Sequence, residues 1–315
     1  MRRSGSTTVD GPSSPWAPVI EIGGTHALAA LVNVRDTCVD AASKRAVALD
    51  SSAPANEILA RIASCARALD APRATTWGVA VPGPFDYARG IGRFHGVGKF
   101  EALNGVSLRG GLTRAVDPQA QMVFLNDAEA FGIGEWIAGA AAGHDRAVAL
   151  TLGTGVGSTF LDAGQAVRHR EDVPPGGSVH RLQIGGRPLE ETVSRRAFLA
   201  RYAELSGMAH VDDDVRGLAR RAAGDGTARA VFDDAYRALG EVLGPWLTRF
   251  GATTLVLGGS IAGSWNLVAP PLANGLRTTE PTLEHTLSIV PATLGQDAAL
   301  LGAAVHAARC RLRSR

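Results

Sequence analysis

The chain has 315 residues, of which 45% are hydrophobic and 20% are charged, and its formal net charge is +2. This length favours two domains, and the composition is ordinary for a globular protein that buries a core. The small net charge argues against a nucleic-acid partner, and no run of about 18 apolar residues is present that could span a membrane.

The first half of the chain opens with a polar stretch, residues 1–18, that lacks the apolar segment of a signal peptide. We expect this stretch to be a disordered tail of a cytoplasmic protein. Apolar runs then predict strands at residues 19–22, 27–34, 45–49, 76–81 and 122–125, and periodic apolar positions predict helices at 57–69 and 128–142. Residues 87–112 are rich in glycine and are expected to form a long loop, which in compact domains is often functional.

The second half of the chain repeats this order. Strands are expected at residues 147–152, 158–161, 254–257 and 287–290, and helices at 193–205, 231–250 and 297–308. The stretches VIEIGGTHALAALV and ALTLGTGVGSTFL both have the pattern of strand, glycine turn and strand, so each half opens with the same unit. This internal repeat predicts two related α/β lobes with a cleft between them.

Glycine-rich segments follow three of the predicted strands. In such turns backbone N–H groups can point at an anion, because no Cβ stands in the way. The segments comprise Gly23, Gly24 and Thr25; Gly153, Thr154, Gly155 and Gly157; and the pair Gly258 and Gly259. One such turn is usually a plain hairpin turn, but their recurrence favours a phosphate and nucleoside site built from backbone. A GxxxxGK[ST] phosphate loop needs a lysine directly after a glycine-rich turn. The chain has only two lysines, Lys44 and Lys99, and we expect neither to follow such a turn, so this kind of phosphate loop is excluded.

Asp127 stands beside Asn126 where a predicted strand gives way to a predicted helix. Asn and Asp are both favoured as helix N-caps, which is the simpler interpretation of the pair. The functional interpretation is that Asp127 is a general base that takes the proton from an attacking hydroxyl. Both interpretations hold together if Asn126 caps the helix and Asp127 faces the cleft.

Six segments, in order along residues 19–305, resemble the ROK family of bacterial sugar kinases and repressors. They read EIGGT (21–25), VPGPFD (81–86), LNDAEAFGIGE (125–135), LTLGTGVGS (150–158), LVLGGSI (255–261) and LGAA (301–304). The resemblance implies an α/β fold of two RNase-H-like lobes of the actin and hexokinase type, with the active site in the cleft between them. Residues 19–125 and 296–315 would form the N-terminal lobe, and residues 126–295 the C-terminal lobe.

The same resemblance implies a glucokinase-like enzyme, a homodimer that transfers the γ-phosphoryl group of ATP to a hydroxyl of a hexose or hexose-like polyol. Asp127 would be the catalytic base. The first and second glycine turns would hold the phosphates, and Gly258 and Gly259 would lie against the nucleoside. The acceptor would be bound by Asn126, His180, Glu190 and Gly83.

The chain departs from the family pattern in three places. Glu21 replaces the usual aspartate of the first glycine turn, and we expect it either to anchor Mg²⁺ through water or to point to solvent. The cysteines of the family's CxCGxxGCxE zinc motif are absent, so no zinc site is expected. The glutamate of the ExGH motif is missing, and Gly177 or Ser178 stands in its place.

These departures leave some roles open. Without thiolate partners, His180 is expected in the acceptor pocket or as a structural histidine rather than as a zinc ligand. Glu190 is either an acceptor ligand or an acidic residue at the start of the following helix. Cys38, Cys65 and Cys310 are far apart and form no CxxC pair, so they are expected to be isolated, reduced thiols.

The acceptor and the class of function also stay open. A C7-cyclitol or an amino sugar could replace the hexose, and polyphosphate could replace ATP. A sugar sensor without catalytic activity is the alternative of another class, motivated by Glu21 and by the missing ExGH glutamate. A repressor is disfavoured, because it needs a helix-turn-helix domain ahead of the first lobe and only 18 residues precede Val19.

Overall fold

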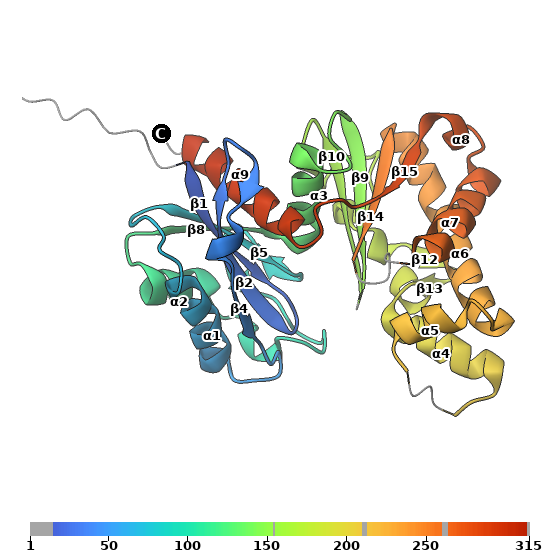
Figure 1. Cartoon of the computed structure of the whole chain (residues 1–315), viewed down its shortest axis with the longest axis horizontal. Helices are drawn as coiled ribbons and strands as arrows, with labels where there is room; N and C mark the ends of the chain where they lie inside the picture. Colours follow the sequence, from blue (N-terminus) through green and yellow to red (C-terminus); the bar gives the residue numbers. More distant parts are fainter. Residues whose placement is uncertain (1–14, 154, 210–212, 260–263, 314–315) are drawn as a thin grey trace, which may run out of the picture.

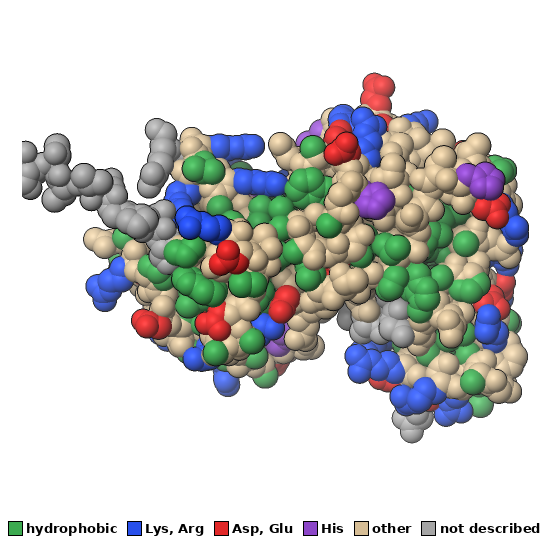
Figure 2. Space-filling model, turned by 45° about the horizontal axis from the view of Figure 1, so that its top comes forward, with side chains coloured by type: hydrophobic (Ala, Val, Ile, Leu, Met, Phe, Trp, Pro, Cys, Tyr) green, Lys and Arg blue, Asp and Glu red, His purple; other side chains and the backbone are tan. Residues whose placement is uncertain are grey.

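The computed structural model describes residues 15–153, 155–209, 213–259 and 264–313. The molecule is elongated, with one β-sheet in its left half, a second β-sheet near its middle and the helices of residues 195–286 at its right end; helices α3 (Asp127–Ala138) and α9 (Asp297–Arg313) lie between the two sheets (Figure 1). The space-filling view shows a notch between the two halves, with acidic and basic side chains intermixed over the visible face (Figure 2). The predicted two-lobed α/β fold is confirmed.

The first sheet has the strand order β3-β2-β1-β5-β8, with β4 also paired to β2. Its strands are β1 (Trp16–Ile22), β2 (His26–Asn33), β3 (Cys38–Val39), β4 (Arg45–Ala48), β5 (Thr76–Val81) and β8 (Gln121–Asn126). Helices α1 (Ala55–Arg67) and α2 (Leu108–Val116) cover one face, and α9 covers the other. Because β1, β5 and β8 are parallel, their carboxyl ends meet at one edge of the sheet.

The second sheet has the strand order β11-β10-β9-β14-β15. Its strands are β9 (Arg146–Leu152), β10 (Val156–Asp162), β11 (Gln165–Val167), β14 (Thr254–Gly258) and β15 (Ser288–Pro291). The helices of this lobe are α4 (Arg195–Ser206), α5 (Val215–Arg221), α6 (Gly226–Phe250), α7 (Trp265–Thr279) and α8 (Leu283–Thr286). The first of the two internal hairpins, β1–β2, therefore has its counterpart in β9–β10, as the repeated sequence pattern predicts.

The remaining strands form two short pairs, β6 (Phe85–Asp86) with β7 (Ile91–Gly92) and β12 (Gln183–Ile184) with β13 (Arg187–Pro188). Single turns of 3-10 helix occur at Ala41–Ser43, Glu101–Leu103, Pro175–Gly177, Val179–Arg181 and Leu189–Glu191. Within the described ranges, no helix combines the length and the apolar character that crossing a membrane requires.

Helices α3 and α9 touch backbone to backbone where they cross. A Cβ atom placed on Gly302 would lie 1.8 Å from the carbonyl oxygen of Ala130, and one placed on Gly134 would lie 2.0 Å from that of Ala298. No side chain fits at either crossing point, so the glycines of the LGAA and FGIGE segments allow the close approach. This contact fixes α9, which follows the second sheet in the chain, against the helix that leaves the first sheet.

A buried carboxylate ties α3 to the connection between β15 and α9. Glu135 is fully buried and accepts hydrogen bonds from the backbone N–H groups of Ala140 (2.8 Å), Thr293 (3.1 Å) and Leu294 (2.9 Å). The hydrogen-bonding capacity of the buried carboxylate is thus used by backbone donors. The junction between the lobes is held by directed bonds as well as by apolar packing.

Most predicted elements are confirmed, with shifted ends. Strand β1 begins at Trp16, so the expected tail of residues 1–18 extends too far; residues 1–14 lie outside the described part of the chain. The loop expected at residues 87–112 holds β7 and the start of α2 instead. Helix α7 was not predicted, because Pro270 and Pro271 interrupt its pattern, but its packing against α6 compensates for them.

Candidate functional site

The predicted catalytic residues lie at the carboxyl edge of the first sheet. Glu21 pairs with Ala80 of β5, and Ala80 pairs with Leu125 of β8, so β1, β5 and β8 end side by side. Glu21 therefore lies one strand away from the Pro82-Gly83-Pro84 segment and two strands away from Asn126. Open α/β sheets bind their ligands outside this edge.

Asn126 is the N-cap of α3, as the sequence predicts. Its Oδ1 accepts hydrogen bonds from the backbone N–H groups of Ala128 (3.0 Å) and Glu129 (3.3 Å). Its Nδ2 donates a hydrogen bond to Tyr87 Oη at 3.0 Å. A Cβ placed on Gly83 would lie 3.5 Å from the same Oη, so Gly83, Tyr87 and Asn126 converge on one spot.

Asp127 is the first residue of α3 and is half-buried. Its Oδ1 accepts a hydrogen bond from the backbone N–H of Ala128 at 2.9 Å. Burial raises the pKa of Asp127 above the ordinary aspartate value, and the Ala128 N–H and the positive charge of Lys99 partly offset this. A carboxylate whose pKa is raised is a stronger base than an exposed aspartate, which suits proton abstraction.

Glu21 is half-buried close to two other carboxylates. Burial raises its pKa to about 7, with further contributions from the negative charges of Asp127 and Asp297. Lys44 Nζ donates to Asp297 Oδ1 at 2.5 Å and so neutralises one of the three. Among the described residues, no three His, Cys, Asp or Glu side chains are close enough to ligate one ion directly. The negative charge nevertheless fits a cation held through water and phosphate.

Glu21→Gln is expected to stabilise the metal-free protein at pH 8 by on the order of 2 kcal/mol, with almost no effect at pH 4. An unfolded glutamate ionises near pH 4.5, whereas the pKa of folded Glu21 is about 7. Between these values the folded state binds more protons, so wild-type stability falls as the pH rises, and the amide removes this loss. Urea unfolding with a chelator at both pH values measures the difference.

The control for this variant is Glu57→Gln, which changes an exposed glutamate on α1. It should show no comparable gain at pH 8. An equal gain from Glu21→Gln at both pH values would mean that ionisation of Glu21 is not the cause.

The first glycine turn closes the β1–β2 hairpin. The backbone N–H of Gly23 donates to the carbonyl oxygen of His26 at 2.8 Å, while the position of a Cβ on Gly24 faces open space. Thr25 is exposed, with its Oγ1 3.4 Å from His26 Nδ1. The hairpin is confirmed, and phosphate binding by this turn stays a prediction.

The second glycine turn closes the β9–β10 hairpin and reaches the helix of Asp127. The backbone N–H of Gly153 donates to the carbonyl oxygen of Gly155 at 3.1 Å; Thr154 lies outside the described residues. A Cβ placed on Gly157 would lie 2.8 Å from the Cβ of Ala128, the residue after Asp127. The second turn and the start of α3 are therefore in contact.

The pair Gly258 and Gly259 lies beside the second turn. Gly259 has a φ of +90°, and a Cβ there would lie 2.3 Å from the carbonyl oxygen of Leu152, the last residue of β9. A Cβ on Gly258 would collide with the ring of Phe131 on α3 at 2.5 Å. Two of the three glycine segments and the helix of Asp127 thus form one cluster.

Glu190 is bonded to the second glycine turn. Its Oε1 accepts a hydrogen bond from the backbone N–H of Val156 at 2.9 Å. Glu190 does not begin the helix expected from residue 193, because α4 begins at Arg195 with Ser194 as its N-cap; Glu190 lies instead in a separate single turn of 3-10 helix, Leu189–Glu191. The half-buried His180 is near it: burial lowers the pKa of His180, and the negative charge of Glu190 opposes this.

The position of the missing glutamate carries no carboxylate in the structure. Gly177 is buried with a φ of +67°, and its carbonyl oxygen accepts a hydrogen bond from Ser158 Oγ at 2.8 Å. Ser158 Oγ in turn accepts a hydrogen bond from the backbone N–H of Val179 at 2.9 Å. Glu190 Oε1 is bonded to the Val156 N–H, and whether Glu190 replaces the lost carboxylate stays open.

Sequence reasoning missed residues that the fold brings to this region, among them Lys99. Lys99 follows Gly96 and Gly98, which both have positive φ, so the expectation that neither lysine follows a glycine turn was wrong. The GVGK sequence was the available signal. The N–H groups of residues 96–98 all bond to the carboxylate of Glu101, so this turn is nevertheless no phosphate loop.

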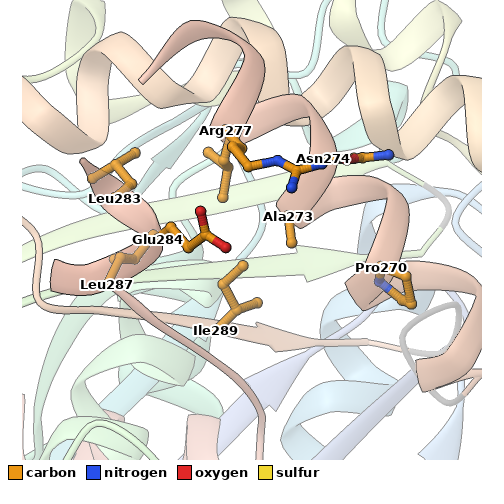
Figure 3. Close-up of a pocket in the computed structure, with 9 residues that line it drawn as sticks. Pro270, Ala273, Asn274, Arg277, Leu283, Glu284, Leu287 and Ile289 are labelled. Atoms are coloured by element: carbon orange, nitrogen blue, oxygen red, sulfur yellow. Dashed lines mark hydrogen bonds between the residues drawn. The ribbon is translucent and has the colours of Figure 1, made fainter. Parts of the chain in front are cut away.

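A surface pocket of about 350 Å³ lies elsewhere, between α7, α8 and β15 (Figure 3). Leu283, Leu287 and Ile289 line it, with the side chains of Arg277 and Glu284 beside them. None of the predicted site residues lines this pocket, so it is not the candidate site.

Comparisons with known proteins agree on one family. The model of the ROK family matches residues 18–171. A glucokinase of Thermotoga maritima is 28% identical over 259 residues, which are 75% of this chain and 80% of the glucokinase. A solved ROK hexokinase from Thermus thermophilus has a TM-score of 0.75 at 24% identity, covering 95% of this chain and 100% of the hexokinase. A ROK family glucokinase from Streptomyces griseus, in complex with glucose and AMPPNP, has a TM-score of 0.72 at 22% identity, covering 93% of this chain and 99% of the glucokinase.

Proposed function

We propose that this chain is an ATP-dependent sugar kinase of the ROK family, whose model matches residues 18–171. It would transfer the γ-phosphoryl group of ATP to a hydroxyl of a hexose or hexose-like polyol. The observation that carries the proposal is the contact between the second glycine turn and the first turn of α3, which puts a candidate base beside a candidate phosphate site. The relatives that support it are the Thermotoga maritima glucokinase and the glucose-bound Streptomyces griseus enzyme.

Asp127 would act as the general base in an in-line transfer. It accepts the proton of the acceptor hydroxyl as the oxygen–phosphorus bond forms, and the bond from the γ-phosphorus to the β–γ bridging oxygen breaks to release ADP. The glycine turns, Gly23 to Thr25 and Gly153 to Gly157, would hold the phosphates, with Gly258 and Gly259 against the nucleoside. A Mg²⁺ ion anchored through water near Glu21 would neutralise the phosphate oxygens.

The acceptor would lie beside Gly83, Asn126 and Asp127, with His180 also lining its pocket. Asn126 Nδ2 keeps one hydrogen beyond its bond to Tyr87, which can serve an acceptor oxygen. Glu190 would act on the same side as His180, through the second turn. We further propose a cytoplasmic homodimer, with an N-terminal lobe of residues 19–125 and 296–315 and a C-terminal lobe of residues 126–295.

A coupled ADP-release assay tests this function. The panel contains glucose, mannose, allose, N-acetylated hexosamines and C7-cyclitols, each with ATP, and polyphosphate replaces ATP in a parallel series that measures the sugar phosphate. We expect release that depends on an acceptor. Sugar binding without turnover of any donor would instead favour the non-catalytic sugar sensor.

The acceptor pocket is expected to discriminate weakly between glucose, 2-deoxyglucose and a carbocyclic analogue, with kcat/KM values within about tenfold, or 1.4 kcal/mol. In a pocket with a buried carboxylate that binds a sugar hydroxyl, an analogue without that hydroxyl leaves the carboxylate unpaired and is strongly disfavoured. Neither Gly177 nor Ser178 offers that carboxylate, and Glu190 is engaged by Val156.

The matched variant is Ser178→Glu, which returns a carboxylate to this segment without straining the positive φ of Gly177. It should increase the preference for glucose. A preference of several hundredfold in the wild-type protein would show that another group replaces the lost glutamate.

A further inference from the structure

A bidentate ion pair joins α3 to the second sheet close to the predicted acceptor ligand. Glu129, the third residue of α3, is buried, and its two carboxylate oxygens accept hydrogen bonds from Nε and Nη2 of Arg168. Arg168 directly follows β11. The pair therefore connects the helix that starts with Asp127 to the segment that leads to Gly177 and His180.

Arg168 also contacts Tyr87 of the first lobe. Its guanidinium carbon lies 5.6 Å from the centroid of the Tyr87 ring, within the range of a cation–π contact. Tyr87 Oη donates to the carbonyl oxygen of Val81 at 3.3 Å and accepts from Asn126 Nδ2 at 3.0 Å. Arg168 is thus linked to the side chain of Asn126 through one aromatic residue.

These contacts close a ring of four residues, Asn126, Tyr87, Arg168 and Glu129, which we call the acceptor-side network. The last link is the backbone N–H of Glu129, which donates to Asn126 Oδ1 at 3.3 Å. Both ends of the Asn126 amide are therefore fixed, Oδ1 by α3 and Nδ2 by Tyr87.

The network also touches the segment that lacks the glutamate. A Cβ placed on Gly177 would lie 3.7 Å from the Cα of Arg168 and 2.8 Å from the carbonyl oxygen of Val167. The segment from Gly177 to His180 is therefore packed on the residue that anchors Glu129. A substitution of Arg168 would therefore disturb both the Asn126 side chain and the Gly177–His180 segment, the two predicted parts of the acceptor pocket.

Stability alone is a poor explanation for this pair. Desolvation of a buried carboxylate offsets much of the attraction of an ion pair, whereas a bidentate arginine–carboxylate pair fixes geometry closely. We propose that Arg168 is a positioning residue for acceptor binding, which orients Asn126 through Tyr87 and Glu129 and seats the Gly177–His180 segment. The inference rests on the proposed sugar-kinase function.

The test compares Arg168→Gln with Arg170→Gln, using glucose or the panel acceptor with the highest kcat/KM. Arg170 lies two residues further on and bonds Asp162 and Asp172, outside the network. We expect Arg168→Gln to raise the acceptor KM at least tenfold, with kcat changed less than threefold and the KM for ATP unchanged. Arg170→Gln should leave the acceptor KM, kcat and the KM for ATP within twofold of their wild-type values.

Because Arg168→Gln leaves Glu129 buried without its partner, the double variant Glu129→Gln/Arg168→Gln is the second measurement. A double variant that regains wild-type stability but keeps the high acceptor KM supports the positioning role. Recovery of the acceptor KM together with stability would overturn it, as would an unchanged acceptor KM in Arg168→Gln. Wild-type protein that turns over no acceptor contradicts the proposed function and this inference with it, whereas an active wild type with an unaffected Arg168→Gln contradicts only the inference.

Discussion

Asp127→Asn is expected to lower kcat at least about 100-fold while leaving acceptor binding nearly unchanged. The amide oxygen of asparagine can still accept the hydrogen bond from the Ala128 N–H, so the start of α3 keeps its geometry. The amide cannot take a proton, so the step that needs a base is lost. Steady-state kcat and the dissociation constant of the acceptor, measured on the same preparation, separate the two effects.

The control for this prediction is Asp214→Asn, which changes the N-cap of α5, where the aspartate accepts a similar hydrogen bond from the Gly217 N–H. It should leave kcat within twofold. If Asp127→Asn keeps more than a tenth of the wild-type kcat while chemistry limits the rate, another group is the base. The raised pKa of Asp127 adds a second signature: wild-type kcat/KM should fall on the acid side at a higher pH than an ordinary aspartate would give.

Gly302→Ala is expected to lower the free energy of unfolding by about 3 kcal/mol, at the upper end of the cost of overpacking. The added Cβ would lie 1.8 Å from the carbonyl oxygen of Ala130, and neither atom can rotate away, because each is fixed in position by its helix backbone. Helices α3 and α9 must therefore separate, which disturbs the junction between the lobes. Urea unfolding at a pH where the wild type is fully folded measures the loss.

Gly226→Ala is the matched control for Gly302→Ala. Gly226 begins α6, and a Cβ there meets no atom within 4 Å. Its replacement should be neutral or stabilising by up to about 1 kcal/mol, the ordinary advantage of alanine over glycine in a helix. Equal stability of Gly302→Ala and the wild type would mean that the two helices do not approach as closely as described.

Elements with local signals could be predicted from the sequence alone. Strand β5 was predicted with its observed ends, Thr76–Val81, because a mainly apolar run ends at the Pro82-Gly83-Pro84 segment. The two glycine-turn hairpins and the N-cap role of Asn126 followed from turn and capping preferences, which depend on a few neighbouring residues. The family resemblance was recognised from the same short segments.

Elements that are stabilised by contacts between separate segments could not be predicted from the sequence. The sequence pattern of α7 argues against a helix because of Pro270 and Pro271, and its packing against α6 outweighs that cost. The end of the expected tail was misplaced for a related reason, since Trp16 joins β1 by pairing with Asn33 of β2. Where a strand begins thus depends on the length of its partner strand, not only on the residues beside its first position.

The candidate site divides in the same way. Asp127 and the glycine turns could be named from sequence, but their contact through Ala128 and Gly157 depends on how β9–β10 packs on α3. The Lys44–Asp297 pair joins residues 253 positions apart, and the acceptor-side network joins Tyr87 to Arg168 across the two lobes. Turn and capping preferences of neighbouring residues determine each turn and each helix cap. Which side chains meet in the cleft depends instead on how the two sheets pack against α3 and α9.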